Sequence, residues 1–247
     1  MASAPVALIT AGSAGLGAAT AKVFAKNGFN VIINYSSNVE RAEKLVEELK
    51  QNSGANVLAI KADLSTRDDI VRLVGEAVEA MGQLNVVFSN GGWTQFRNFS
   101  DLNDNLVEDD WDKCFNMNVK SHLWLMHAAK RHLDATEGAF ITTASVAGVG
   151  VSGSSLAYSV TKAAQIHLAK ALAVLAAPKI RVNSVSPGLL LTDWGNKFSD
   201  EGKAAHIQKT KLKRAVTVQD VAEQVYTLAR SRSITGVNVV IDGGFSL

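Results

Sequence analysis

The sequence predicts an α/β fold, in which a single doubly wound parallel sheet of about seven strands carries helices on both faces. Short apolar runs rich in β-branched residues alternate along the chain with longer segments of helical periodicity. The short runs are apolar at consecutive positions, which is typical of strands covered on both faces. Because strand–helix–strand connections are right-handed, this alternation indicates a doubly wound sheet.

The expected elements follow one another in regular order. Short runs of strand-forming residues place strands at 6–10, 30–35, 56–61, 84–89, 139–144, 180–185 and 237–241. Helical spacing of apolar residues places helices at 15–27, 39–51, 67–81, 108–133 and 155–177, with another beginning near Val218. The least regular segments, 91–105 and 189–215, each follow a strand. Both are therefore expected at the carboxyl edge of the sheet, where open α/β sheets bind ligands.

Composition limits the class of protein. The chain has 247 residues and is 47% hydrophobic, which suffices for one sizeable core, so we expect residues 1–247 to form one domain. The 25 basic and 23 acidic residues give a net charge of +2, and no basic block stands out, so no nucleic-acid partner is expected. The single cysteine, Cys114, cannot form an intramolecular disulfide, which fits a reducing compartment.

Neither a membrane nor a metal is expected as a partner. The start of the sequence resembles no secretory signal, and no apolar stretch approaches the roughly 20 residues needed to span a bilayer. A cytoplasmic protein is the resulting expectation. His127 and His132 are five residues apart, a poor spacing for metal ligands on one helix face.

A glycine-rich turn follows the first strand and opens the first helix. It has the sequence Thr-Ala-Gly-Ser-Ala-Gly-Leu-Gly. Glycines allow the backbone to approach a pyrophosphate, and the helix N-terminus adds unpaired N–H groups and partial positive charge. The spacing G-x-x-G-x-G alone would also fit a turn without a ligand, but its position favours dinucleotide binding. The expected contacts are Gly12, Ser13, Gly15, Leu16 and Gly17.

The end of the second strand predicts which dinucleotide binds. An acidic side chain there would bond the ribose 2′-hydroxyl and select NAD, but the stretch is Asn-Tyr-Ser-Ser-Asn. We expect Tyr35, Ser36 and Ser37 at the cofactor, with hydroxyls that can donate to a 2′-phosphate and Arg41 one helical turn away. This pattern favours NADP over NAD. Ser37 or Asn38 would also serve as the N-cap of the next helix, and both interpretations can hold together.

Tyr158 and Lys162 are spaced i, i+4 and so share one helix face. An ammonium near a phenol stabilises the phenolate and lowers its pKa from about 10. The tyrosine could then donate a proton to a carbonyl oxygen or accept one from an alcohol. Such a pair alone is common on helix surfaces. Ser145, however, ends an apolar strand 13 residues before the tyrosine, and a serine there can bond the same substrate oxygen.

These motifs resemble those of the short-chain dehydrogenase/reductase family, and the resemblance covers essentially the whole chain. The matching motifs are 10–17 for the T-G-x-x-x-G-x-G loop, 89–92 for N-N-A-G, Asn118 for the helix asparagine, Ser145, the Tyr158–Lys162 pair for Y-x-x-x-K, 187–192 for P-G-x-x-x-T and 242–244 for the C-terminal Asp-Gly-Gly. Two departures stand out. Ala11 replaces the usual first glycine, and Ser-Asn-Gly-Gly replaces Asn-Asn-Ala-Gly.

The resemblance implies a Rossmann-type fold and a catalytic role for four residues. Tyr158 would be the general acid/base, and Lys162 would lower its pKa and bond the nicotinamide ribose. Ser145 would orient the substrate oxygen. Asn118 would hold a water molecule that connects Lys162 to solvent.

The resemblance also implies the remaining contacts with the cofactor. Asp63 would bond the adenine amino group, and Thr192 with the backbone of Leu190 would fix the carboxamide. The other expected contacts are Leu64, Asn90, Gly91, Gly92, Pro187 and Gly188.

Three aromatic residues are candidates for the substrate pocket. Trp93, Phe96 and Trp194 lie in irregular segments just beyond cofactor-contact motifs, and core packing is the equally weighted alternative. The segment 189–215 combines aromatic residues with glycines, which suits a substrate lid that excludes water. Its alternative is a rigid pair of surface helices.

The sequence leaves three functions open. The first is an NADPH-dependent carbonyl reductase for a bulky, apolar ketone or quinone-like ring, because aromatic residues mark both loops and the pattern looks somewhat like fungal naphthol reductases. The second is a 3-oxoacyl carrier-protein reductase; Glu137, where a basic residue would be expected, weighs against it. The third is a non-catalytic NADP-sensing regulator, although such proteins commonly lack the tyrosine or lysine that this chain has.

The long helices predict self-association. Residues 108–133 and 155–177 carry more apolar surface than one sheet face can cover, and family members pair through these helices. A homotetramer or homodimer is therefore expected.

Overall fold

The computed structural model describes residues 3–247, so that the first two residues of the expected domain lie outside the description. It shows a seven-stranded parallel sheet with the strand order β3-β2-β1-β4-β5-β6-β7. The order reverses between β1 and β4, which creates the switch point where doubly wound sheets bind ligands. The predicted fold class is confirmed. The strands are β1 Val6–Ile9, β2 Asn30–Tyr35, β3 Val57–Lys61, β4 Val86–Ser89, β5 Ala139–Thr143, β6 Arg181–Pro187 and β7 Asn238–Ile241.

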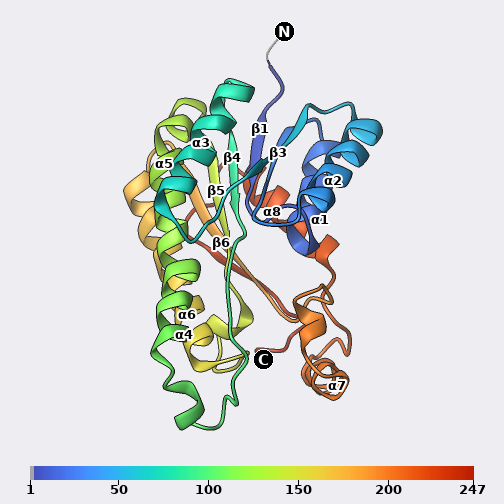
Figure 1. Ribbon diagram of the computed structural model, residues 1–247, viewed down its shortest axis with the longest axis vertical. Coiled ribbons are helices and arrows are strands. Elements are labelled where there is room, and N and C mark those ends of the chain that lie inside the picture. The colour runs from blue at the N-terminus through green and yellow to red at the C-terminus, as the bar shows by residue number, and fades with distance from the viewer. Residues whose placement is uncertain (1–2) are drawn as a thin grey trace.

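Helices cover both faces of the sheet (Figure 1). One face packs against α1 (Gly15–Lys26), α2 (Val39–Ser53) and α8 (Val218–Arg230). The other face packs against α3 (Arg67–Met81), α5 (Ser121–Thr136) and α6 (Leu156–Ala176). The sheet is thus the middle of three layers.

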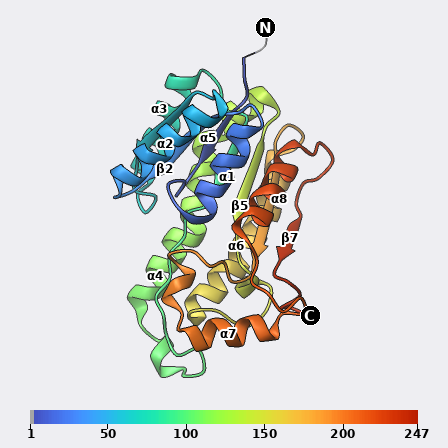
Figure 2. The ribbon, with the colours of Figure 1, turned by 90° about the vertical axis from the view of Figure 1, so that its right-hand side faces the viewer.

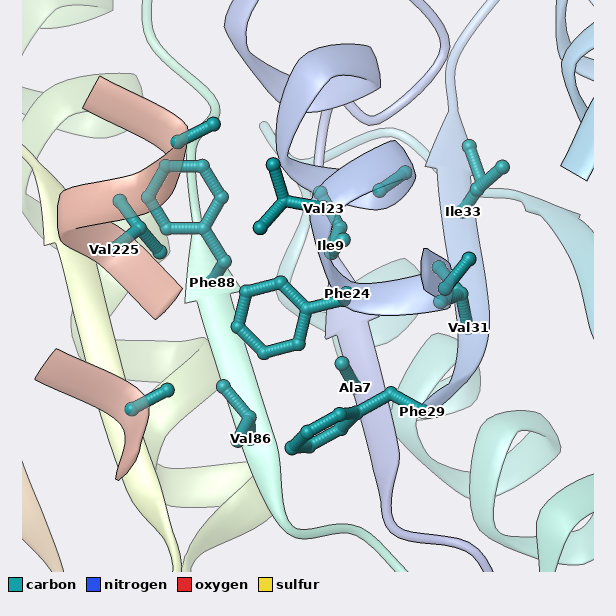
Figure 3. Close-up of a cluster of buried hydrophobic side chains, with 14 of the residues drawn as sticks. Ala7, Ile9, Val23, Phe24, Phe29, Val31, Ile33, Val86, Phe88 and Val225 are labelled. Carbon is teal, nitrogen blue, oxygen red and sulfur yellow. The ribbon is translucent and has the colours of Figure 1, made fainter. Parts of the chain in front are cut away.

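Side chains at alternating positions along the strands point into two separate hydrophobic cores, one on each face of the sheet. In β1, Ala7 and Ile9 point into the core beneath α1 and α8, while Val6 and Leu8 point into the core beneath α3, α5 and α6. The first core is shown in Figure 3, where Phe24 lies between the strands and Val225 of α8. Because both faces are covered, groups that meet a ligand must come from the strand ends and the loops beyond them.

The carboxyl ends of the strands face the remaining helices (Figures 1 and 2). These are α4 (Glu108–Phe115) and α7 (Asp200–Lys209). They belong to the two long connections that follow β4 and β6, as the sequence predicts. In the part of the chain that the structure describes, no helix is long and apolar enough to cross a membrane.

The single helix predicted over residues 108–133 is wrong, and it is the main difference between the predicted and observed elements. The segment consists of α4, a π-helical turn at Asn116–Lys120 and α5. Within this stretch the Ser121 hydroxyl donates to the carbonyl of Met117 at 2.7 Å. Hydrophobic periodicity does not distinguish a π-turn from continuous helix, and such turns are frequent at functional sites. Here the turn contains Asn118.

Candidate active site

A cavity of about 790 Å³ opens at the carboxyl edge of the sheet, and its wall combines residues from many parts of the chain. The predicted cofactor contacts in this wall are Gly15, Leu16, Ser36, Asn90, Gly92, Tyr158, Lys162, Pro187, Gly188, Leu190 and Thr192. The predicted contacts outside the described wall are Gly12, Ser13, Gly17, Tyr35, Ser37, Asp63, Leu64 and Gly91. The wall also includes Ser145 and Arg41.

Three of the four predicted catalytic residues meet at the cavity wall. Ser145 follows β5, and Tyr158 and Lys162 come from the first turns of α6. The hydroxyl of Ser155 caps this helix by accepting from the backbone N–H of Tyr158 at 3.2 Å. The cap fixes where α6 begins and so places the phenol beside Ser145.

The protonation of the pair differs from the sequence expectation. Burial raises the pKa of Tyr158 to about 12, and a hydrogen bond with Ser145 lowers it only in part. Burial lowers the pKa of Lys162 to about 7. Burial and the Ser145 hydrogen bond are the main influences on the phenol pKa, while Lys162 Nζ lies 5.6 Å from the ring centroid and donates to the carbonyl of Thr143 at 2.8 Å. The phenol therefore stays protonated at neutral pH and can donate to a carbonyl oxygen.

Asn118 lies behind the described cavity wall and is fully buried. Its Oδ1 accepts from the backbone N–H of Trp93 at 2.8 Å, and its Nδ2 donates to the carbonyl of Trp93 at 2.9 Å. A Cβ on Gly92 would lie 3.3 Å from Asn118 Oδ1 and 3.5 Å from Lys162 Nζ. Asn118 therefore holds the segment after β4 close to Lys162.

The glycine-rich loop has the geometry of a phosphate site. A Cβ on Gly17 would lie 2.3 Å from the carbonyl oxygen of Ala11, and Gly15 has a φ of +51°. Ala14 is the N-cap residue of α1, and its side chain accepts no hydrogen bond from the helix. The first N–H groups of this helix are therefore available to an anion. These features fit the diphosphate of a dinucleotide.

Ala11 departs from the family pattern and adopts a left-handed conformation with a φ of 47°. Its N–H donates to the side chain of Asn34 at 3.1 Å. The loop therefore keeps a backbone conformation that favours glycine, despite the alanine.

At the end of β2, Asn38 is the residue that caps α2. Its side chain accepts from the backbone N–H of Arg41 at 2.9 Å. The guanidinium of Arg41 forms an exposed ion pair with Asp193 at 2.9 Å. Ser36 and Arg41 both line the cavity, so a serine hydroxyl and a cation stand where the 2′-position of a dinucleotide is expected.

The residues after β3 lie beside this region. The carboxylate of Asp63 accepts from the backbone N–H of Ser65 at 2.8 Å. Leu64 is buried, and a Cβ on Gly91 would lie 2.4 Å from it. Leu64 therefore packs directly beneath the segment after β4, and its side chain would have to shift to make room for a side chain at residue 91.

The loop after β6 closes the cavity from the other side. Pro187, Gly188, Leu190 and Thr192 line it. A Cβ on Gly15 would lie 3.3 Å from the Thr192 side chain. The two loops that would hold opposite parts of a dinucleotide therefore touch each other.

The three predicted substrate residues have different positions. Trp194 lines the cavity, with its ring centroid 6.3 Å from that of Tyr158. Phe96 lies outside the described wall but packs edge-on against Phe198, which is part of it, at 4.8 Å. Trp93 is not part of the cavity wall. Lys113 Nζ lies 5.9 Å from the centroid of its ring, and Asn118 bonds its backbone.

Sequence reasoning missed two aromatic residues of the site, His206 and Phe245, which line the cavity. Phe198, an aromatic residue of the predicted lid segment, lines it as well. The rings of His206 and Phe245 stack with centroids 4.2 Å apart, so the end of the chain contributes to the wall. The aromatic residue directly after the Asp-Gly-Gly signature was the available signal. Among the described residues, no group of three His, Cys, Asp or Glu side chains could hold a metal ion.

The arrangement was compared with known proteins. A family model described as enoyl-(acyl carrier protein) reductase matches residues 10–246. The chain belongs to the short-chain dehydrogenase/reductase family. It is therefore an oxidoreductase that acts on carbonyl or hydroxyl groups.

Curated relatives of this short-chain dehydrogenase/reductase match along nearly its whole length. A protein assigned as ketoacyl reductase 2 of the granaticin polyketide synthase of Streptomyces violaceoruber is 35% identical over 99% of this chain and 97% of its own. A 3-oxoacyl-[acyl-carrier-protein] reductase of Staphylococcus aureus is 33% identical over 96% of each chain. Versicolorin reductase 1 of Dothistroma septosporum is 33% identical over 97% of this chain and 95% of its own.

Solved structures share the same fold. A short-chain dehydrogenase of Burkholderia cenocepacia in complex with NADP has a TM-score of 0.91 and 31% identity, covering 99% of both chains. The NADPH-dependent 3-quinuclidinone reductase of Rhodotorula rubra has a TM-score of 0.90 and 27% identity, covering 98% of this chain and 91% of its own.

Proposed function

We propose that this short-chain dehydrogenase/reductase is an NADPH-dependent carbonyl reductase whose substrate is a bulky, largely apolar ketone or quinone-like ring. The observation that carries the proposal is the position of Tyr158, a protonated phenol that is hydrogen-bonded to Ser145 and has the ring of Trp194 beside it in the cavity wall. A carbonyl oxygen within reach of both hydroxyls would place the rest of the substrate against the aromatic wall.

The chain's residues divide the work of the reaction. Bound NADPH supplies the hydride. Tyr158 donates its proton to the carbonyl oxygen as negative charge develops there, and Ser145 donates a second hydrogen bond that orients this oxygen. Lys162 would bond the nicotinamide ribose, and a proton taken up from solvent by way of Lys162 would return to Tyr158, which restores the acid. The family resemblance assigns to Asn118 the water molecule that would connect Lys162 with solvent.

NADPH is the proposed cofactor because no acidic residue follows β2 and because Ser36 and Arg41 line the cavity. The ion pair between Arg41 and Asp193 is solvent-exposed on both sides and so contributes little. Arg41 can therefore exchange Asp193 for a 2′-phosphate. The NADP complex among the structural neighbours supports this assignment.

Reduction of a 3-oxoacyl group on a carrier protein is the second candidate. The Staphylococcus aureus relative favours it. Glu137 does not count against this candidate, because it precedes β5 and therefore lies at the edge of the sheet opposite the cavity. It is too far from the active-site entrance to repel an acidic carrier protein there. The presence of Tyr158 and Lys162 at one cavity favours an enzyme over a cofactor sensor.

We further propose that residues 189–215 act as a substrate lid and that the protein is a homotetramer or homodimer. Trp194 and Phe198 of this segment line the cavity, and none of the residues of α7, all of which are described, is buried.

Self-association is supported by exposed apolar side chains on α5 and α6, where Leu123 is 44% exposed and Val174 is 77% exposed. The buried free thiol of Cys114 fits the reducing conditions of the cytoplasm.

A carbonyl panel tests the proposed function. The purified protein is mixed with NADPH or NADH and with small ketones, bicyclic aromatic ketones, quinones or a 3-oxoacyl thioester, and nicotinamide absorbance is followed. We expect the largest kcat/KM with NADPH and a bicyclic ketone or quinone. A clear preference for the thioester would select the second candidate, and no turnover with any carbonyl would overturn both.

A further inference from the structure

We propose that Gln165 is a positioning residue for Lys162, and that His122 and Ser89 hold Gln165 in the required orientation. No part of the catalytic motif includes these three side chains. They come from α6, α5 and the end of β4 and form one buried chain of hydrogen bonds. The inference rests on the proposed function, because it concerns the hydrogen bonds that orient Lys162 in the proposed active site.

The chain of contacts is continuous. Gln165 Oε1 lies 2.9 Å from Lys162 Nζ, and Gln165 Nε2 lies 2.9 Å from His122 Nε2. His122 Nδ1 lies 2.6 Å from the Ser89 hydroxyl. Thr142 Oγ1 and, at 3.1 Å, the carbonyl of Thr143 also lie within hydrogen-bond distance of the Gln165 amide nitrogen, whose two N–H groups are shared among these three acceptors.

The direction of every bond follows from the lysine. The ammonium form of Lys162 has N–H donors and no acceptor, so the amide atom that faces it is the oxygen. The amide NH₂ then faces His122, whose Nε2 must accept. The imidazole proton is therefore on Nδ1, from which it donates to Ser89.

The surroundings keep His122 in this neutral form. Burial, together with the charge of Lys162, lowers the pKa of His122 to about 3. A protonated imidazole would present N–H at Nε2 and would force the Gln165 amide to turn its NH₂ toward Lys162. Neutral His122 thus fixes the amide, and the amide fixes the lysine.

The hydrogen-bond count of Lys162 shows what this arrangement achieves. A protonated lysine has three N–H donors. Thr143 and Gln165 accept two of them, and Lys162 lines the cavity although it is only 3% exposed. The third donor is thereby directed to the cavity, where a ribose hydroxyl is expected. Without Gln165, the amine would keep only the Thr143 contact and could rotate about it.

The location of the chain supports a role beyond packing. Gln165 is fully buried on the face of α6 that further along carries Ala169 and Leu172, and His122 lies on the face of α5 that carries Leu125. An apolar residue at either position would avoid the cost of burying polar groups. The sequence instead places two polar side chains whose bonds converge on the lysine.

Two variants separate positioning from packing. Gln165→Leu removes the acceptor at similar volume. Asn183→Leu, the matched control, removes a fully buried amide in β6 that bonds residues 234 and 237, away from Lys162. We expect Gln165→Leu to lower kcat by about tenfold, the equivalent of one hydrogen bond to a charged group, and to raise KM for NADPH with little change in KM for the carbonyl. Asn183→Leu should lower only the melting temperature. Equal kcat and NADPH KM in Gln165→Leu and the wild type would overturn the proposal.

A measurement on the unmodified protein tests the chain without a variant. Nitrogen NMR of the histidine rings should show His122 protonated at Nδ1 and unprotonated at Nε2 throughout the neutral pH range. A proton on Nε2 would contradict the proposed amide orientation. This measurement does not depend on turnover. If the wild type had no carbonyl reductase activity, the proposed function would be rejected. The ring tautomer would still decide whether the hydrogen-bond chain exists.

Discussion

Ala11 occupies a left-handed backbone conformation beside the cavity, where glycine would avoid the steric contact between Cβ and the following carbonyl. We expect Ala11→Gly to raise the free energy of unfolding by about 1 kcal/mol, because the relief of strain exceeds the added entropy of the unfolded chain. Denaturant titration measures this change. Ala14→Gly is the control, since Ala14 is extended with a φ of −149° and its replacement should not stabilise. A loss of stability in Ala11→Gly would contradict the strain argument.

At the residue scale, motif spacing predicted the residues that line the site, but it did not predict the side chains that hold them in place. Ser145, Tyr158 and Lys162 line one cavity, as expected from a strand-end serine and an i, i+4 pair. Gln165 and His122 were missed because helical periodicity identifies a buried face without showing which polar groups on it will meet across two helices. Nor did the sequence predict that Asn118 would bond the backbone of Trp93, a contact between residues 25 positions apart.

At the element scale, the turn between β2 and α2 is expected to select the cofactor. We expect kcat/KM to be higher with NADPH than with NADH, and Ser36→Asp to shift the ratio toward NADH because a carboxylate repels the 2′-phosphate. Ser37→Asp is the matched control, since Ser37 lies outside the described cavity wall and should shift the ratio less. Equal efficiency with both cofactors in the wild type would refute the assignment.

The segment between β6 and α8 is expected to select the substrate. Trp194→Ala should raise KM for bulky apolar ketones more than for small ones, since Trp194 lines the cavity beside Tyr158. Leu191→Ala, at a side chain that is 53% exposed and outside the described wall, should leave both KM values unchanged. If Trp194→Ala changed the two KM values equally, the residue would be structural and the lid proposal would lose its main support.

Element boundaries followed from the sequence wherever local signals exist. β2 and α3 have the predicted bounds, and the strand predicted at 84–89 begins two residues later in the structure. The π-helical turn at Asn116–Lys120 was not predicted, because a shift of hydrogen-bond partner depends on packing around Asn118 rather than on the apolar pattern. The segment 189–215 looked irregular and yet contains α7, whose residues lack a buried apolar stripe.

At the scale of the whole molecule, apolar surface remains uncovered. Val174 and Leu175 on α6 are 77% and 73% exposed, and Leu123 on α5 is a further exposed apolar side chain. We expect light scattering at micromolar concentration to give two or four times the 26.2 kDa chain mass, because association would bury these side chains. A mass near 26.2 kDa would rule out the proposed homo-oligomer.

The topology explains why residues so far apart in sequence form one site. Parallel strands end at the same edge, so the glycine-rich loop after β1, Ser145 after β5 and Thr192 after β6 converge there. Alternating strands and helices were enough to predict this edge. The shape of the substrate end was not predictable, because Phe198, His206 and Phe245 reach the cavity only through the folding of α7 and the chain end against it.

The central claim is that the Tyr158 phenol protonates the carbonyl oxygen of the substrate. It is tested most directly by comparing the turnover of the wild type and Tyr158→Phe with NADPH and the best carbonyl of the panel. Phenylalanine keeps the ring and removes only the hydroxyl. The account predicts nearly unchanged NADPH affinity and a turnover lower by at least roughly a hundredfold. A variant that retained more than about a tenth of wild-type turnover would contradict the assignment of Tyr158 as the acid.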